Sequence, residues 1–444
     1  MRYLLRPAAV LVLAGCATRS AAPPLEPAAA VAAFDAAWDI VHRTHFDTTF
    51  NGVDWRALRE ELRPRAESAR TREELRATIR AMLGRLGQSH FALFPEEIAE
   101  RGDTARDRAA LANPGLDLRY VGGRLVVSDV RAGGPAARAG VQPGWTVEAV
   151  GDETAARILE RVAAQPSHYR LGLRAARSVL ARLQGPPGEP IPMRFRDGQG
   201  REVQLGLERE AEEGALVRFG NLPPFISRFD WRRERPGGGE ALAVFRWNNW
   251  MVPLMRQVDA AMDSARDARG WIIDLRGNPG GAGVMTMGVA GHFIARPDTF
   301  GTMMTRAGRM VFTVNPRRVA AGGRRSEPFA GPVAVLVDGH SGSASEVFAG
   351  GVRSLGRVRV FGDTTIGGVL PAVTDRLPNG DVLYHAIGDF HTARGEYLEG
   401  RGVVPDEVVV PGRADYAAGR DPVLEAARRW LLMQINRSAS GGIP

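Results

Sequence analysis

The stretch GPVAVLVDGHSGSASEVFAGGVRSLGRVRVFGDTTIGG, residues 331–368, predicts a strand, a turn, a helix and a second strand in succession. Its residues 333–337 are continuously apolar, which is typical of a strand buried on both faces of a parallel sheet. Small polar residues follow, and apolar residues then recur at helical spacing from Val347 to Leu355. Ser343 therefore falls where a buried strand turns into a helix N-terminus, at the sheet edge where α/β folds bind ligands. A serine there is a candidate nucleophile, although serines before helices also serve as caps alone.

A second unit of the same kind lies upstream, in WIIDLRGNPGGAG, residues 271–283. A buried strand again leads through a glycine-rich turn into an apolar helix. If the two units are adjacent, the N–H groups of Gly280 and Gly281 can donate to an oxyanion formed by attack of Ser343. The N–H group of Ala344 joins them. A simple tight turn is the alternative, and phosphate binding is disfavoured because no P-loop lysine or full dinucleotide fingerprint is present.

Composition narrows the chemistry available to the chain. Its 444 residues allow two or three domains, and its hydrophobic (44%) and charged (24%) fractions are those of an ordinary globular protein. The net charge is +8, but the basic residues are dispersed and no recognition motif accompanies them, so we expect no nucleic-acid partner. All 58 basic residues are arginine. A lysine base, a Schiff-base lysine and a phosphate-binding lysine are therefore excluded.

The N-terminus, MRYLLRPAAVLVLAGCATRS, predicts a signal peptide over residues 1–15, with two arginines before a short apolar core. Leu-Ala-Gly-Cys is typical of a bacterial lipobox, so we expect lipid attachment at Cys16 and a tether over residues 16–28. Because Cys16 is the only cysteine, a disulfide within the chain is excluded. A plain secretory signal is the alternative. Either interpretation places the protein outside the cytoplasm, and the lipobox predicts a lipid-anchored protein of the bacterial envelope, in the periplasm.

Residues 29–103 form a predicted helical region. Thr71 is a plausible helix cap, and Glu74 three residues later is its capping-box partner. Gly87 ends the last helix, and Ser89 and His90 follow shortly after it. On local grounds alone, a histidine just past a helix is most often a structural residue.

Residues 104–210 change to short β-type runs punctuated by glycine, and this region resembles a PDZ domain. The motif GGPAARAGVQPG, residues 133–144, carries the resemblance. It implies a module that binds a peptide as an added strand. A helical stretch over 168–183 lies outside the PDZ strand pattern. The resemblance implies that the carboxylate-binding loop consists of Gly115, Leu116, Asp117 and Leu118.

The motifs DLRGNPGG, SASE, GDTTIGG and GRGVVPD follow in this order behind LGQSH, and together they resemble the S41 family of serine peptidases. The resemblance covers residues 33–430. It implies an α/β fold with a ClpP/crotonase-like core over residues 211–444, containing a mixed sheet. The N-terminal helical region and an inserted PDZ-like domain complete the expected fold, and an amphipathic helix over 422–433 closes it.

The chain departs from one branch of that family. In the C-terminal processing proteases a lysine base stands at the position of Gly368, and this chain has none. The tricorn-type branch uses histidine instead, and resemblance to it implies four catalytic residues. These are Ser343 as nucleophile, His90 as base, Ser89, and Glu399 as the acidic partner. His340 is an alternative base, and Glu396 and Asp363 are alternative acids.

Three function classes follow. The first is a serine endopeptidase that cleaves extended or C-terminal segments of a polypeptide through an acyl-enzyme on Ser343. The second is an inactive peptide-binding lipoprotein. The third is a non-peptidase serine hydrolase, which the lack of a Gly-x-Ser-x-Gly motif at Ser343 disfavours. No cofactor is expected, and no histidine cluster at ligand spacing predicts a metal site.

Overall fold

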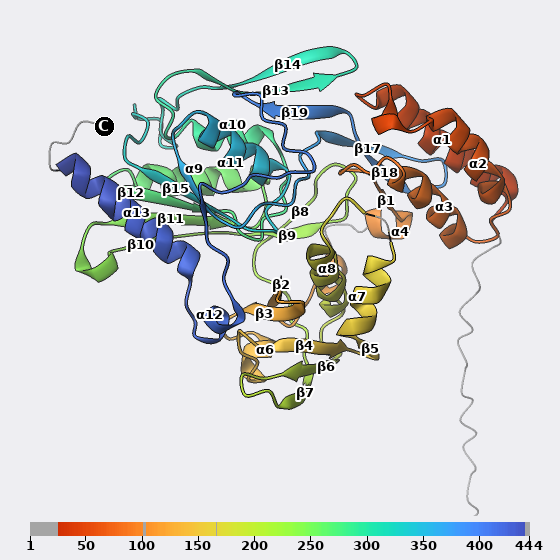
Figure 1. The fold of residues 1–444 in the computed structure, drawn as a ribbon, viewed down its shortest axis with the longest axis horizontal. Helices are drawn as coiled ribbons and strands as arrows, with labels where there is room; N and C mark the ends of the chain where they lie inside the picture. The colour runs from red at the N-terminus through yellow and green to blue at the C-terminus, as the bar shows by residue number, and fades with distance from the viewer. Residues whose placement is uncertain (1–24, 101–103, 166, 440–444) are drawn as a thin grey trace, which may run out of the picture.

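The computed structural model describes residues 25–100, 104–165 and 167–439, which form an N-terminal helical region, a small β domain and a larger α/β core (Figure 1). The predicted signal peptide and Cys16 lie outside the described residues. No helix within the described ranges is long and apolar enough to cross a membrane.

The core is built on a six-stranded sheet in the order β10-β11-β12-β15-β16-β20. Strand β10 is antiparallel to β11, and the other neighbours are parallel, so the expected mixed sheet is confirmed. The strands are β10 Phe229–Glu234, β11 Leu242–Trp247, β12 Gly270–Asp274, β15 Val333–Val337, β16 Arg359–Gly362 and β20 Glu407–Val408.

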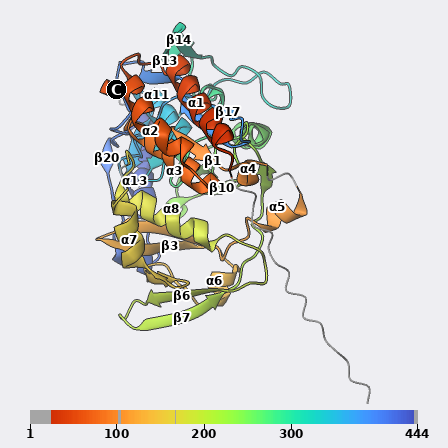
Figure 2. The ribbon, with the colours of Figure 1, turned by 90° about the vertical axis from the view of Figure 1, so that its right-hand side faces the viewer.

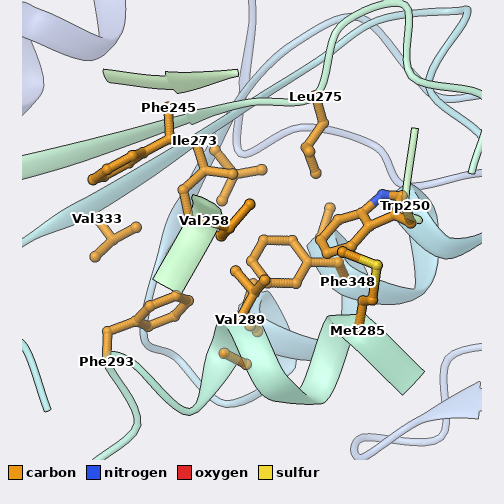
Figure 3. Packing of buried hydrophobic residues seen from close by; sticks show 14 of the residues in the cluster. Phe245, Trp250, Val258, Ile273, Leu275, Met285, Val289, Phe293, Val333 and Phe348 are labelled. Atoms are coloured by element: carbon orange, nitrogen blue, oxygen red, sulfur yellow. The ribbon is translucent and has the colours of Figure 1, made fainter. Parts of the chain in front are cut away.

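Both faces of this sheet are buried, which explains its continuous apolar strands. Val333 and Val335 face one cluster, in which Phe348 packs beside strand residues (Figure 3). Ala334 and Leu336 face a second cluster against the C-terminal helix. The helices of the first face are α9 Met255–Ser264, α10 Val284–Ala290 and α11 Ala344–Ser354; the second face is covered by α13 Pro422–Ala439.

Two core helices begin or end at identifiable residues. A 3-10 turn at Val252–Leu254 precedes α9, because Pro253 lacks an N–H and fits only a helix start. The helix after the glycine-rich turn, α10, ends at Ala290.

The N-terminal region contains α1 Pro27–Thr44, α2 Trp55–Glu67 and α3 Arg72–Gly84. The predicted Thr71/Glu74 capping box is confirmed at the start of α3. A strand that the sequence analysis missed, β1 Ala92–Phe94, pairs with β18 Val382–Ala386 of the core, which pairs with β17 Ala372–Arg376. This three-stranded sheet fixes the segment just before it, residues 88–90, against the core.

The small domain has its own sheet, in the order β2-β3-β4-β6-β7, and its own apolar core. Reciprocal backbone hydrogen bonds join Asn113 and Glu210 where the chain enters and leaves it. Its helices α7 and α8 lie below the N-terminal helices (Figure 2). The elements are β2 Leu116–Val121, β3 Arg124–Val130, α6 Pro135–Arg138, β4 Thr146–Val150, β5 Glu153–Thr154, α7 Ala155–Ala163, α8 Leu171–Leu183, β6 Ile191–Arg196 and β7 Glu202–Leu207.

The remaining elements surround the core. One separate sheet consists of β14 Gly308–Val314, β13 Asp298–Thr305 and β19 Gly388–Thr392. A second, two-stranded sheet consists of β8 Ala215–Val217 and β9 Phe225–Ser227. Short helices are α4 Glu96–Ala99, α5 Ala105–Ala109 and α12 Arg413–Ala417, with 3-10 turns at Phe50–Gly52 and Pro236–Gly238.

Candidate active site

Ser343 lies between β15 and α11 in a strained backbone conformation. Its φ is +52°, in the left-handed region that non-glycine residues rarely adopt. Its N–H donates to the carboxylate of Glu346 (2.9 Å) and to the carbonyl of Gly368 (3.0 Å). Strain of this kind persists only where neighbours enforce it, and it is found preferentially at functional sites.

Glu346 is the residue that holds this loop together. Its fully buried carboxylate accepts hydrogen bonds from Thr365 Oγ1 (2.5 Å) and from the N–H groups of Gly367 (2.6 Å) and Gly368 (3.0 Å), besides that of Ser343. Burial raises its pKa to about 7, and these hydrogen bonds oppose that rise. Glu346 thereby ties the start of α11 to the GDTTIGG loop.

His90 approaches Ser343 from the N-terminal region. Its Nε2 lies 3.1 Å from Ser343 Oγ, and its Nδ1 lies 2.6 Å from Ser89 Oγ. Its φ is +62°, so both residues of the pair are strained. The ring of Tyr384, from β18, lies 5.5 Å from the imidazole between centroids. Strand pairing of β1 with β18 thus places a histidine from the first quarter of the chain beside the candidate nucleophile.

A chain of hydrogen bonds fixes the tautomer of His90. Glu399 Oε2 lies 2.9 Å from Ser89 Oγ, and a carboxylate accepts only, so the Ser89 hydroxyl donates to it. The same hydroxyl must then accept from His90 Nδ1–H. This leaves His90 Nε2 unprotonated and able to accept the Ser343 proton. Glu399 is held in turn by the N–H groups of Ser89 (2.8 Å) and Val369 (2.9 Å).

The surroundings keep the imidazole of His90 neutral. Burial, with smaller electrostatic contributions from His168 and Arg177, lowers its pKa to about 4. At neutral pH His90 is therefore an unprotonated base.

The glycine-rich turn after β12 borders Ser343 closely. A Cβ on Gly280 would lie 2.6 Å from Ser343 Cβ and 3.1 Å from Ala344 N. Among the described residues, the N–H groups of Gly281 and Ala344 donate to no protein acceptor, which leaves both available to an oxyanion. The prediction for Gly280 is wrong, because its N–H donates to Asn278 Oδ1 (2.9 Å).

Comparisons with known proteins indicate the family of the core and of the N-terminal helical region. The profile of peptidase family S41 matches residues 242–409, and the Tricorn protease C1 domain matches residues 29–84. A carboxyl-terminal-processing protease of Synechocystis sp. is 25% identical over 376 residues, covering 84% of this chain and 79% of that protein. The core of the chain, residues 242–409, is therefore an S41-type peptidase domain. It is a serine-type peptidase.

Two solved structures share the fold of this S41 peptidase. The photosystem II D1 C-terminal processing protease is 21% identical with a TM-score of 0.58, covering 88% of this chain and 96% of that one. Mature CPAF is 11% identical with a TM-score of 0.65, covering 93% and 98%. At these sequence identities, the similarity supports a shared fold and nothing further.

In this S41 peptidase, a side chain at the position of Gly368 would fit only if its neighbours moved slightly. A Cβ there would lie 3.2 Å from Ser89 Cβ and 3.3 Å from Tyr169 Cε1. The Ser89 hydroxyl and the Tyr169 ring thus fill the space that a side chain at this position would enter. A glycine at position 368 therefore leaves the space that Ser89 needs to support the histidine base.

The alternative residues lie elsewhere. His340 is on the Asp338 side of the loop, where its N–H donates to Asp338 Oδ1 (3.0 Å), and within the described residues it makes no hydrogen bond to Ser343. Glu396 forms an ion pair with Arg353 (3.0 Å). Asp363 accepts a hydrogen bond from the N–H of Thr364 (2.7 Å). None of these carboxylates reaches His90 or Ser89 within the described part of the chain.

Two residues of the small domain that were not predicted from the sequence support the site. His168 Nε2 donates to the carbonyl of Gly367 (2.6 Å) and lies 3.6 Å from Glu399 Oε1. The Tyr169 hydroxyl interacts with the backbone of His90, and burial raises the pKa of Tyr169. Both lie in the loop before α8, and no sequence motif distinguishes them; only their place in the unexplained helical stretch over 168–183 hinted at a role.

The predicted carboxylate-binding loop is partly used by the protein itself. Gly115 N–H donates to Asn113 Oδ1 (2.9 Å), and Leu118 N–H donates to the side chain of Asp117 (2.9 Å). Of the four predicted loop residues Gly115, Leu116, Asp117 and Leu118, the first and the last therefore have amides that are already hydrogen-bonded within the protein. Asp117 also pairs with Arg119 (2.9 Å).

Arg119 docks the small domain onto the catalytic edge of the core. Its Nε donates to Asp338 Oδ2 (2.9 Å), while Asp338 Oδ1 accepts from Gly277 N–H (2.9 Å). Burial alone raises the pKa of Asp338, but Arg119 and these backbone donors outweigh it and hold the pKa well below its ordinary value. One carboxylate therefore links the small domain to both loops that border the site.

The cleft at Ser343 has a volume of about 580 Å³ and is lined mainly by apolar and aromatic side chains, and His90 and the glycine-rich turn also line it. In the described ranges no three histidine, cysteine or acidic side chains lie together as metal ligands would.

Proposed function

We propose that this peptidase cleaves extended or C-terminal peptide segments with Ser343 as nucleophile and His90 as general base. The observation that carries the assignment is the unbroken hydrogen-bonded chain from Glu399 through Ser89 and His90 to Ser343. Each member has the polarity that its neighbour requires, because the carboxylate accepts, the hydroxyl relays and the imidazole faces the nucleophile with a lone pair.

Acylation begins when Ser343 Oγ attacks the carbonyl carbon of the scissile peptide bond and its proton passes to His90 Nε2. The resulting oxyanion accepts hydrogen bonds from the N–H groups of Gly281 and Ala344. When the tetrahedral intermediate collapses, the C–N bond breaks and His90 Nε2–H protonates the leaving amine. The imidazolium that exists between these steps is stabilised through Ser89 by the charge of Glu399.

Deacylation repeats the proton transfers with water. His90 accepts a proton from the water as its oxygen adds to the ester carbonyl, and the oxyanion again forms between Gly281 and Ala344. The ester C–O bond then breaks, Ser343 Oγ regains its proton from His90, and the carboxylic acid product leaves. General acid–base assistance of this kind typically contributes about 10² to 10⁴ in rate.

The substrate class rests on the relatives and on the cleft. The Synechocystis relative is named for carboxyl-terminal processing, and the apolar cleft of about 580 Å³ suits an extended peptide segment. The small domain resembles a peptide-binding module. Because the amides of Gly115 and Leu118 are already hydrogen-bonded, a peptide bound there would use other donors of that loop.

A fluorophosphonate probe tests the assignment, because it labels only activated serines. We expect labelling of the wild-type chain over residues 17–444, and its loss in both Ser343→Ala and His90→Ala. Turnover of casein should fall in both variants, by about 10² to 10⁴ for His90→Ala, while peptide binding is kept. Unchanged turnover in His90→Ala would sink the histidine assignment, and hydrolysis of p-nitrophenyl esters without casein cleavage would indicate a different serine hydrolase.

We further propose that the protein acts outside the cytoplasm, anchored to the bacterial envelope through a lipid on Cys16. The lipobox-like Leu-Ala-Gly-Cys sequence supports this. Metabolic labelling with a clickable fatty acid should mark wild-type protein and not Cys16→Ser, which should appear in the soluble fraction. Labelling of Cys16→Ser would overturn the proposal.

A further inference from the structure

The cleft at Ser343 contains one charged side chain that the mechanism does not use. Of the charged groups that line it besides His90, Glu212 is paired with Arg228 (2.9 Å). Arg177 is the other, and it makes no hydrogen bond, ion pair or ring contact with any residue in the described ranges. A lone guanidinium with five donors therefore faces the space into which a substrate must enter.

The fold places Arg177 there by helical spacing. Arg177, Leu180 and Gln184 lie three and then four residues apart along and just beyond α8, and all three line the cleft. The opposite side of α8, including Ala176 and Val179, is buried in the core of the small domain. The position of Arg177 is thus fixed by a packed helix rather than by a free loop.

Arg177 lies close enough to the catalytic residues to act on them. Its positive charge contributes to the lowered pKa of His90, after burial and His168, and it also acts on the Tyr169 hydroxyl. A group bound by Arg177 would consequently lie near the reacting peptide bond, in a cleft whose walls are otherwise mostly apolar.

We infer that Arg177 is a specificity-determining residue that binds a carboxylate of the peptide substrate, carried either by an acidic side chain or by the chain's C-terminus. The inference rests on the proposed peptidase function and deepens it. A guanidinium pairs with a carboxylate through two parallel hydrogen bonds, and the low polarity of the surrounding cleft strengthens such a pair. An unneutralised arginine likewise disfavours basic side chains at the same subsite.

The test compares quenched decapeptides that differ only in charge. One series carries Glu or Gln at each successive position around the cleavage site, and a second carries a free C-terminal carboxylate or an amide. All assays use the purified full chain at pH 8, where His90 is neutral with or without Arg177. We expect the preferred acidic peptide to exceed its neutral partner in kcat/KM by roughly tenfold or more.

Three variants make the result specific. Arg177→Gln should abolish the preference while keeping cleavage of the neutral peptides, and Arg177→Glu should reverse it towards lysine-containing peptides. Arg182→Gln is the matched control, because Arg182 lies on the same helix but pairs with Glu153 away from the cleft. It removes the same charge and should leave the preference intact.

The outcomes distinguish failure of the Arg177 assignment from failure of the proposed peptidase function. Preference in the Glu series identifies an acidic side chain as the ligand, and preference in the C-terminal series identifies the terminal carboxylate. Equal cleavage of acidic and neutral peptides by wild type and Arg177→Gln overturns the inference while the peptidase function stands. Cleavage of no peptide by labelled wild-type protein overturns the proposed function itself.

Discussion

The loops after β12 and β15 leave neighbouring parallel strands at the same edge of the sheet, yet they contribute different atoms to the site. The β15 loop supplies the side chain of Ser343, held at a positive φ by hydrogen bonds to Glu346 and Gly368. The β12 loop supplies only an N–H group, that of Gly281. There φ is +141°, and a Cβ would lie 2.3 Å from the carbonyl oxygen of Trp250.

The difference shows two ways of fixing a catalytic group. In the β15 loop a non-glycine residue is forced into strain, and buried hydrogen bonds compensate for that strain. In the β12 loop there is no side chain to orient, so glycine relieves the conformational cost and close packing against Trp250 aims the N–H. Side-chain substitutions should therefore damage the first loop through lost hydrogen bonds and the second through steric overlap.

Among substitutions that keep the four proposed catalytic side chains, breaking the β12 loop should have the largest effect. Gly281→Ala places a methyl group against the Trp250 carbonyl, so the loop must shift and its N–H must leave the oxyanion position. Loss of one oxyanion donor typically reduces kcat by about 10²–10³. Gly283→Ala is the control, since a Cβ there meets nothing within 4 Å and its φ is an ordinary −57°. Equal kcat values for the two variants would contradict the role of Gly281.

Glu346→Gln tests the β15 loop through its stability. The pKa of Glu346 is raised from 4.5 to about 7, so between these values the folded protein holds a proton that the unfolded chain has released. Its contribution to stability is therefore present below about pH 4.5 and is lost as the pH rises to about 7, by about 3 kcal/mol. Glutamine does not titrate, so the variant should lack this dependence.

The measurement is urea unfolding of both proteins from pH 4 to pH 8. Glu396→Gln serves as the control, because Glu396 is partly exposed beside Arg353 and should leave the pH dependence unchanged. A Glu346→Gln profile parallel to that of wild type would show that folding does not raise the pKa of Glu346.

The same contrast explains what could be predicted from the sequence. Strand β15 has the predicted residues, because a short apolar run bounded by polar residues leaves little freedom in register. Ser343 is a candidate nucleophile from the strand-turn-helix pattern alone. Ser89, His90 and Glu399 are predicted only because the motifs resemble the tricorn-type branch, since the histidine and glutamate come from distant parts of the chain. The four side chains do lie in one hydrogen-bonded line.

Other features were beyond sequence reasoning because they depend on which backbone groups remain unpaired. The N–H of Gly280 looked equivalent to that of Gly281, and only the position of Asn278 distinguishes them. Strand β1 is three residues long and has no alternating pattern of its own, so its pairing with β18 became visible only in the fold. His168 and Tyr169 act through contacts between domains, which local patterns do not encode.

Gly368→Ala sharpens the comparison at the point where the β15 loop meets the histidine. The added methyl group would lie 3.2 Å from Ser89 Cβ, so Ser89 must move by a few tenths of an ångström and the alignment of His90 with Ser343 suffers. We expect kcat to fall roughly tenfold with KM nearly unchanged. Gly339→Ala, whose Cβ would meet only atoms at ordinary distances, is the matched control and should keep wild-type kcat. A loss confined to KM would place the effect in substrate binding.

The pH dependence of kcat/KM gives the smallest effect and the most direct view of the histidine. The reaction needs neutral His90, whose pKa burial lowers to about 4, so activity is lost only as the pH falls through that value. At pH 6 the enzyme should keep nearly full kcat/KM, whereas an unperturbed imidazole would leave it about fourfold lower. Because Arg177 contributes to the lowered pKa, Arg177→Gln should move the acid limb to higher pH for a neutral peptide, while Arg182→Gln should not. Because Glu346 titrates in the same loop, the profile is also measured on Glu346→Gln. An acid limb near pH 6.5 in both wild type and Glu346→Gln would contradict the lowered pKa of His90.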